Sequence, residues 1–468
     1  MSARARTRAL VAIAALFAQS ATISCRWELR ALPDEPDASD AMALDVAAPD
    51  ASALPACAPS SEAPVREPSA RDPFVHRATL VRPATVDIGR GACTGDLDGD
   101  GQRELLVLRA DAFADIVDPR SLCVRSTIAV PPYGRACLVD DLDLDGAPEL
   151  AIAHSIRFSA RFRERYEARA LDSVSVGHVA RRAADSPELR WSWPTSWSLG
   201  EDRHVRGVGH VLVALDLDRD GDRELAMAGT ITTEERTQQA FVRAWEFSAG
   251  ACSGERRCPR SVFDRSFFDT LDTNDLFVTS VDDDPEPELV ADLGCNGGGL
   301  YAVNTPWEQA DFTRLAAIGQ PSHGAFADVD GDRAQDYLAA ITPRCGGGAN
   351  TALRWLRRED NEFRFVNEAP NPQFARSAQA MVVAVDALGD ARPEALVCSR
   401  DIALLDSHPI RCDLYSFSSL HIDHEWTWIE PEAHPDMISR LIAEDVNGDG
   451  AQDVLVVTQA RVHLLLGR

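Results

Sequence analysis

The 468-residue chain contains no lysine, so arginine supplies all 47 of its basic side chains. The absence of lysine excludes Schiff-base chemistry and any lysine that clamps a phosphate. The basic residues are also outnumbered by 74 acidic residues, which gives a formal net charge of −27. Because nucleic-acid binding needs a basic surface that neutralises phosphates, this charge argues against a nucleic-acid partner.

Catalytic signatures are missing as well. The sequence has no nucleophile elbow, HExxH motif, P-loop or dinucleotide fingerprint. It has no CxxC pair, which argues against a zinc site. The densest histidine group is His421, Asp423 and His424, but on a strand His424 would face away from the other two. A surface strand is therefore the favoured interpretation, and we assign no catalytic or organic-cofactor residues.

Long hydrophobic runs are lacking too. The apolar run of residues 9–18 is too short to cross a bilayer as a helix, and arginines precede it. We predict that residues 1–24 are a signal peptide of the lipoprotein type and that Cys25 is lipidated. Ordinary cleavage near Ser20 is the alternative, because Thr22 replaces the usual lipobox leucine. Either way we expect an exported protein: an outer-membrane lipoprotein facing the periplasm or cell surface, or a secreted protein.

Eleven cysteines are present, and ten remain for up to five disulfides if Cys25 carries lipid. The expected local pair is Cys252 with Cys258, and Cys398 with Cys412 is expected across neighbouring strands. The other pairings stay open. Residues 25–72 are acidic and rich in proline and alanine, so we predict a disordered linker there.

A nine-residue acidic loop recurs through the rest of the chain. Acids occupy positions 1, 3, 5 and 9, and Gly101 at position 6 of the first copy allows a sharp turn. Carboxylates at this density suit Ca²⁺, and the residue at position 7 would add its backbone carbonyl. The predicted ligands of the first copy are Asp96, Asp98, Asp100, Gln102 and Glu104.

Four further copies supply predicted metal ligands. The second has Asp141, Asp143, Asp145, Ala147 and Glu149, and the third has Asp216, Asp218, Asp220, Asp222 and Glu224. The copy with Arg333 in place of glycine has Asp328, Asp330, Asp332, Ala334 and Asp336. The last copy has Asp445, Asn447, Asp449, Ala451 and Asp453. Two eroded copies, residues 280–288 and 386–394, lack ligands, and we assign no metal to them.

The spacing of the loops predicts the fold. They open at positions 96, 141, 216, 280, 328, 386 and 445, and short strand-like runs fill each interval. Such β units at a repeated period are typical of a propeller. We predict an all-β, seven-bladed β-propeller over residues 73–468, closed by an outer strand at residues 78–81. The longest interval implies an inserted loop between residues 156 and 204, where Trp191, Trp193 and Trp197 gather.

The loops resemble FG-GAP or VCBS-type repeats, which form the seven-bladed propeller of integrin α subunits and of many secreted bacterial proteins. The resemblance covers about residues 75–468. It implies that each loop joins the first two strands of a blade and binds Ca²⁺ through the matching acids.

Two rival interpretations of the motif are weaker. An EF-hand needs a glutamate at position 12 and a following helix. Position 12 here is apolar and lies in a strand-like run, as Val107 and Met227 illustrate. Acidic turns that merely solvate the surface would explain the two eroded copies but not five matching ones. We expect about four to five Ca²⁺ ions, which would stabilise the fold because the unfolded chain lacks the assembled sites.

Three functions remain open. The favoured one is a monomeric, non-enzymatic module that binds or adheres to a protein or glycan and reaches a membrane only through its lipid anchor. The alternatives are a carbohydrate-active hydrolase or lyase on a propeller scaffold, and a structural surface spacer. Fold alone does not decide among them, because propellers carry many activities.

Overall fold

The structure, a computed structural model, describes 29 strands and no helix within the part of the chain from Asp72 to Gly467. The predicted signal peptide, Cys25 and the linker up to residue 71 lie outside the described residues. The described residues are 72–81, 91–109, 113–131, 134–142, 144, 146–155, 172–178, 188–194, 197–198, 204–217, 220–232, 238–248, 258–267, 272–282, 286–294, 298–303, 312–318, 322–341, 352–370, 378–401, 409–431 and 436–467.

The strands form antiparallel sheets that follow one another along the chain. The first holds β2 (Ala92–Gly95), β3 (Glu104–Leu108), β4 (Phe113–Asp118) and β5 (Cys123–Ala129). The second holds β6 (Gly134–Asp140), β7 (Glu149–Ser155), β8 (Asp172–His178) and β9 (Glu188–Pro194). The third holds β10 (Trp197–Ser198), β11 (His204–Leu215), β12 (Glu224–Thr232), β13 (Gln238–Ser248) and β14 (Cys258–Phe267).

The remaining sheets continue the pattern. The fourth holds β15 (Asp272–Thr279), β16 (Glu288–Gly294), β17 (Gly299–Val303) and β18 (Phe312–Ala317). The fifth holds β19 (Ser322–Ala327), β20 (Asp336–Ile341), β21 (Ala352–Glu359) and β22 (Glu362–Pro370). The sixth holds β23 (Ala378–Val385), β24 (Glu394–Asp401), β25 (Arg411–Ser418) and β26 (His421–Ile429). The last holds β27 (Ile438–Glu444), β28 (Asp453–Thr458), β29 (Arg461–Gly467) and β1 (Phe74–Val81).

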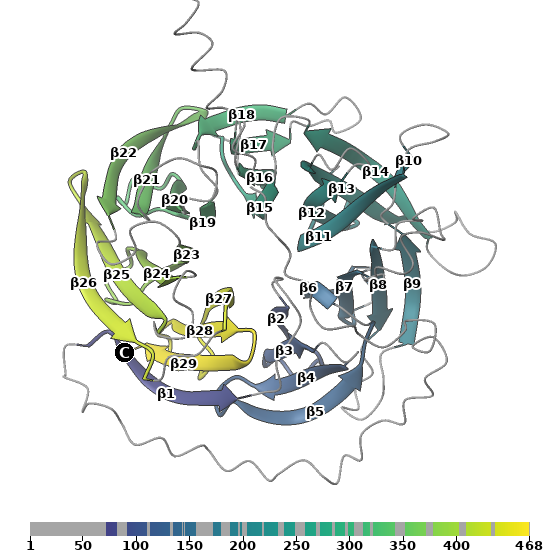
Figure 1. Cartoon of the computed structure of the whole chain (residues 1–468), viewed down its shortest axis with the longest axis horizontal. Coiled ribbons are helices and arrows are strands. Elements are labelled where there is room, and N and C mark those ends of the chain that lie inside the picture. The colour runs from purple at the N-terminus through teal and green to yellow at the C-terminus, as the bar shows by residue number, and fades with distance from the viewer. Residues whose placement is uncertain are drawn as a thin grey trace, which may run out of the picture.

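The sheets are arranged radially round a central axis, with β2, β6, β11, β15, β19, β23 and β27 innermost (Figure 1). We call these innermost strands the first strands, so β11 is the first strand of the third sheet and the additional strand β10 is left out of this count. Each first strand lies beside the first strand of the next sheet, and β27 lies beside β2, so the ring closes. The N-terminal strand β1 pairs antiparallel with β29 and supplies the outer strand of the last sheet. This confirms both the all-β propeller fold and the predicted closure by residues 78–81.

Two expectations need correction. The described strands give six regular four-stranded sheets, not seven, because the third sheet carries a fifth strand, β10. The predicted loop between residues 156 and 204 is also partly wrong, since the described part of that interval forms β8, β9 and β10. Trp191 and Trp193 lie in β9 and Trp197 in β10, where strand pairing with β8 and β11 holds their backbones.

The hydrophobic core lies between neighbouring sheets. The buried apolar side chains of the described residues form seven clusters, each shared by two adjacent sheets. Second strands such as β3, β20 and β28 are buried at every residue, whereas the outer strands β22 and β26 are largely exposed. Second strands therefore begin at buried or, in β16, partly buried positions, and the acid at position 9 of each loop lies there.

Disulfides add covalent links to the described strands. Cys398 and Cys412 lie directly opposite each other on β24 and β25 and form the predicted cross-strand disulfide. Cys93 on β2 is bonded to Cys137 on β6, so this disulfide joins two neighbouring sheets. Cys123 is disulfide-bonded as well. The predicted pair of Cys252 with Cys258 lies outside the residues whose side chains are described. No described segment forms a helix long and apolar enough to cross a membrane.

Candidate metal centres

Every acidic loop occupies the same place in its sheet, between the first strand and the second. The first strand ends one residue before position 1, and the second strand begins with the acid at position 9. In the first sheet β2 ends at Gly95 and β3 begins at Glu104, and the loops that open at positions 141, 216, 280, 328, 386 and 445 follow the same rule. The expected placement is confirmed, and the two eroded copies share it.

In six of the seven loops, the acid at position 9 accepts a hydrogen bond from the backbone N–H at position 2. In the first loop the Leu97 N–H donates to Glu104 Oε2 at 3.0 Å, and both side chains are buried. In the last loop Val446 N–H donates to Asp453 Oδ2 at 3.0 Å. The same contact joins Leu142 to Glu149, Leu217 to Glu224, Val281 to Glu288 and Ala387 to Glu394. This acid therefore satisfies a buried backbone donor even in loops with few metal ligands, a role that the sequence pattern did not reveal.

Position 6 turns the chain back toward position 1. The four glycines there have φ between 83° and 92°, and Arg333 adopts the same left-handed region with φ 73°. Its backbone N–H donates to Asp328 Oδ2 at 2.8 Å, as Gly101 N–H donates to Asp96 Oδ2 at 2.9 Å. A side chain in this region costs roughly 1 kcal/mol relative to glycine. The missing glycine thus adds strain without changing the path of the loop.

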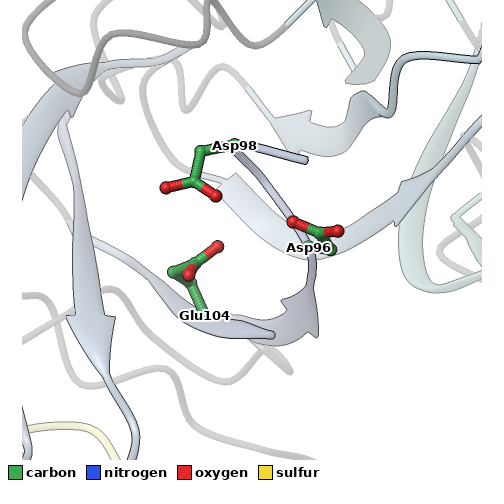
Figure 2. A group of neighbouring side chains, drawn as sticks. All are labelled: Asp96, Asp98 and Glu104. Carbon is green, nitrogen blue, oxygen red and sulfur yellow. The ribbon is translucent and has the colours of Figure 1, made fainter. Parts of the chain in front are cut away.

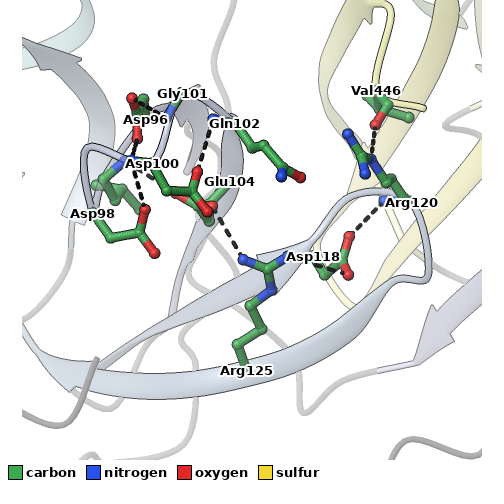
Figure 3. A network of polar contacts seen from close by, with 11 residues as sticks. Asp96, Asp98, Asp100, Gly101, Gln102, Glu104, Asp118, Arg120, Arg125 and Val446 are labelled. Carbon is green, nitrogen blue, oxygen red and sulfur yellow. Dashed lines mark hydrogen bonds and ion pairs between the residues drawn. The ribbon is translucent and has the colours of Figure 1, made fainter. Parts of the chain in front are cut away.

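The first loop brings three of its predicted ligands together. Asp96, Asp98 and Glu104 each place a carboxylate oxygen within 4.8 Å of the others. Figure 2 shows these carboxylates turned toward a shared space, two from the loop and one from the start of β3. Asp100 lies beside them and accepts a hydrogen bond from Gln102 N at 2.8 Å (Figure 3).

The electrostatics of this group follow from burial. Burial raises the pKa of Glu104 to about 7, and the negative charges of Asp98 and Asp100 add to the rise. Two contacts oppose it: the Leu97 N–H, and Arg125, whose Nη1 lies 3.2 Å from Glu104 Oε1. Arg125 also pairs with Asp118 at 3.3 Å, so its charge is shared between two carboxylates (Figure 3).

The residues of the first loop fit calcium. Their donors are carboxylate oxygens, the hard ligands that Ca²⁺ prefers over nitrogen or sulfur. Three carboxylates in close proximity repel one another, and a divalent cation would relieve that repulsion. Asp96, Asp98 and Glu104 are the side chains that would hold the ion.

The structure describes most of the other predicted ligands. Asp143, Asp145 and Asp218 lie outside the described residues, so the second and third loops are described only in part. In the last loop Asn447 Nδ2 donates to Asp449 Oδ2 at 2.8 Å. The residue at position 7 donates its N–H to the acid at position 5 in several loops. These pairs are Asp222 with Asp220, Ala334 with Asp332, and Ala451 with Asp449. Ala147 is among the described residues. Asp328, Asp330 and Asp332 form a second group, in which each residue places a carboxylate oxygen within 4.8 Å of the others.

The histidine group of β26 is part of a structural network. His424 Nε2 lies 3.0 Å from Asp413 Oδ1, and Thr427 Oγ1 donates to the same oxygen at 2.6 Å. The first sheet has the same arrangement without a histidine, because Thr127 Oγ1 donates to Asp115 Oδ1 at 2.9 Å. Recurrence on the third and fourth strands of two sheets indicates a packing role, in line with the predicted surface strand.

Comparisons with known proteins identify the architecture. No protein-family model matches the sequence, and no curated protein matches it. Among solved structures, BBS1N in complex with ARL6DN aligns with a TM-score of 0.51 at 10% identity, covering 85% of this chain and 98% of that chain. The exotype rhamnogalacturonan lyase YesX aligns with a TM-score of 0.46 at 13% identity, covering 84% of this chain and 75% of that chain. The likeness to BBS1N concerns the fold alone.

Proposed function

We propose that this chain is an exported, calcium-stabilised β-propeller of FG-GAP or VCBS-type repeats that acts as a binding module for a protein or glycan. One observation carries the calcium assignment: Asp96, Asp98 and Glu104 converge at a loop whose position between two strands recurs in every sheet. In this proposal the five-stranded sheet counts as the seventh blade, since it has the same acidic loop and the same interfaces.

The disulfides support export. Structural disulfides persist in oxidising compartments and are rare in the cytosol. The Cys93–Cys137 and Cys398–Cys412 bonds lie among buried residues of the core. Lipidation of Cys25 and residence in the outer membrane or outside the cell remain part of the proposal. They are tested by labelling cells that express the chain with a radioactive fatty acid, with Cys25→Ser as the unlabelled control.

The outer strands offer a surface for a partner. Phe365 on β22 is 60% exposed, and Leu420 at the turn before β26 is 54% exposed. Asn367 Nδ2 donates to the Leu420 carbonyl at 2.8 Å, which links these two strands of neighbouring sheets. Exposed apolar side chains on two linked strands favour a protein partner over a purely structural role.

Calcium binding tests the central part of this proposal. Equilibrium dialysis of the mature chain should find several tightly bound ions, and Asp98→Asn should bind one ion fewer. Ser280→Ala is the matched control in an eroded loop and should leave the number unchanged. Failure of the unmodified chain to bind calcium would refute the assignment.

Ligand screens test the binding role. A glycan array and a polysaccharide activity screen, both with calcium, separate glycan binding from catalysis and from an inert spacer. Turnover of a polysaccharide would replace the binding-module proposal with an enzyme. Loss of a recovered partner in the Phe365→Ser, Leu420→Ser double variant would assign the interface to the surface between β22 and β26.

A further inference from the structure

The acidic loop of residues 328–336 differs from the first loop in what its carboxylates contact. Its acids Asp328, Asp330 and Asp332 also lie within 4.8 Å of one another. Here Arg357 of β21 reaches into the group. Its Nε lies 2.9 Å from Asp330 Oδ2, and its Nη2 lies 2.8 Å from Asp332 Oδ2. One guanidinium therefore joins the carboxylates at positions 3 and 5.

The acid at position 9 of this loop, Asp336, contacts β21 instead of the loop backbone. Asp336 accepts hydrogen bonds from Trp355 Nε1 at 3.1 Å and from Arg358 N at 3.2 Å. Both donors belong to β21, the strand that carries Arg357. In the first loop, by contrast, Glu104 belongs to the group of converging carboxylates. The carboxylate group of the loop of residues 328–336 therefore does not include the acid at position 9, which in the first loop is one of the three converging carboxylates.

The first loop provides the comparison for the arginine contacts. Arg125 contacts Glu104 and Asp118, whereas Asp96 and Asp98 accept hydrogen bonds from backbone N–H groups. In the loop of residues 328–336, the guanidinium binds two acids at once with charge-assisted hydrogen bonds, which are about twice as strong as neutral ones. Arg392 of the next sheet lies beside Gly331 and adds positive charge at this corner.

We propose that Arg357 supplies the positive charge in the loop of residues 328–336 that calcium supplies in the first loop, so this corner needs no metal ion. A calcium ion would have to displace the guanidinium from Asp330 and Asp332. This inference rests on the proposed calcium binding for its comparison between loops. It reduces the expected number of ions by one and makes the fifth sheet independent of metal.

A count of bound calcium tests the exclusion. Equilibrium dialysis is carried out on the full chain and on the Asp330→Asn and Asp98→Asn variants. The inference predicts that Asp330→Asn binds as many ions as the unmodified chain, while Asp98→Asn binds one fewer. Loss of one ion in Asp330→Asn would overturn it, because the loop would then be an occupied calcium site.

Thermal unfolding in chelator tests the role of the arginine without any metal. Arg357→Met keeps the aliphatic part of the side chain and should lower the unfolding midpoint by about 1–3 °C, because Asp330 and Asp332 lose their counter-charge. The midpoint of Arg357→Lys should lie between those of the unmodified chain and Arg357→Met. Arg364→Met, which removes an exposed ion pair with Glu359, is the matched control and should lower the midpoint less. An unchanged midpoint for Arg357→Met would overturn the inference. If the unmodified chain bound no calcium, the proposed function would fail, while this measurement would still decide the role of Arg357.

Discussion

Arg103 Nε lies 2.6 Å from Glu444 Oε1, and this ion pair joins the first sheet to the last. Arg103 occupies position 8 of its loop, and Glu444 immediately precedes the loop of the neighbouring sheet. The same relationship recurs where Arg223 pairs with Asp140, which precedes the loop of the second sheet. At the corresponding position of the last loop, Gln452 Oε1 accepts a hydrogen bond from Asp386 N at 2.9 Å. Position 8 thus links neighbouring sheets, and Arg103 carries the link across the closure of the ring.

A double-mutant cycle measures this link. Arg103 is 58% exposed on its side chain, so solvent screens the pair, and we expect a coupling free energy of roughly 0.2–1 kcal/mol. Urea unfolding of Arg103→Ala, Glu444→Ala and the double variant gives the value, and it should shrink in 1 M salt. A coupling that did not change with salt would argue against an electrostatic link.

The closing strand β1 depends on a buried hydrogen bond. Thr79 Oγ1 lies 3.0 Å from His463 Nδ1 of β29, and both residues are buried. Thr79→Val keeps the shape but leaves a buried imidazole nitrogen without this partner, so it should lower the free energy of unfolding by about 1–3 kcal/mol. Arg77→Ala, at an exposed position of the same strand, should change it by less than about 0.5 kcal/mol. Equal effects in the two variants would contradict this account of the closure.

The two described disulfides should differ in their contribution to stability. Cys93 and Cys137 are separated by 44 residues, and Cys398 and Cys412 by 14. Loop-closure entropy then predicts that the first bond stabilises by about 1 kcal/mol more than the second. Denaturant unfolding of the Cys93→Ser, Cys137→Ser and the Cys398→Ser, Cys412→Ser double variants tests the order. The reverse order would indicate that native-state contacts, and not the unfolded chain, dominate.

Glu394 should make stability depend on pH. Burial raises the pKa of Glu394 to about 7, so protonation favours the folded state. Its contribution is fully present below the unfolded pKa of about 4.5 and is lost as the pH rises through 7. Glu394→Gln keeps an oxygen that can accept from Ala387 N, so it should raise the unfolding midpoint at pH 8 and leave it unchanged at pH 4.5. A midpoint lowered at pH 8 would show that the charge stabilises the fold.

The sequence predicted the repeated local features well. The spacing of acids and apolar runs placed the loops between first and second strands, because that pattern reflects short-range backbone geometry. The cross-strand pair Cys398–Cys412 also followed from two neighbouring strand-like runs. The eroded loop at 386 keeps its backbone path with Ala391 at φ 66°, so this turn forms without a glycine at position 6.

The sequence pattern did not predict the contacts between neighbouring sheets. The Cys93–Cys137 bond and the Arg103–Glu444 pair join segments that meet only when the sheets are arranged in a ring. Arg357 lies 25 residues after Asp332, and nothing in the repeat indicates that its guanidinium reaches this loop. The fifth strand of the third sheet escaped prediction because β10 is only two residues long.

The calcium dependence of thermal unfolding tests the central claim most directly. The unfolding midpoint of the mature chain is measured at pH 7.5 in excess chelator and at increasing calcium, with Asp98→Asn beside it. The account predicts that the midpoint rises with calcium concentration and that the rise is smaller in Asp98→Asn, because binding to the folded state alone stabilises it. An identical midpoint in chelator and in millimolar calcium would contradict the account.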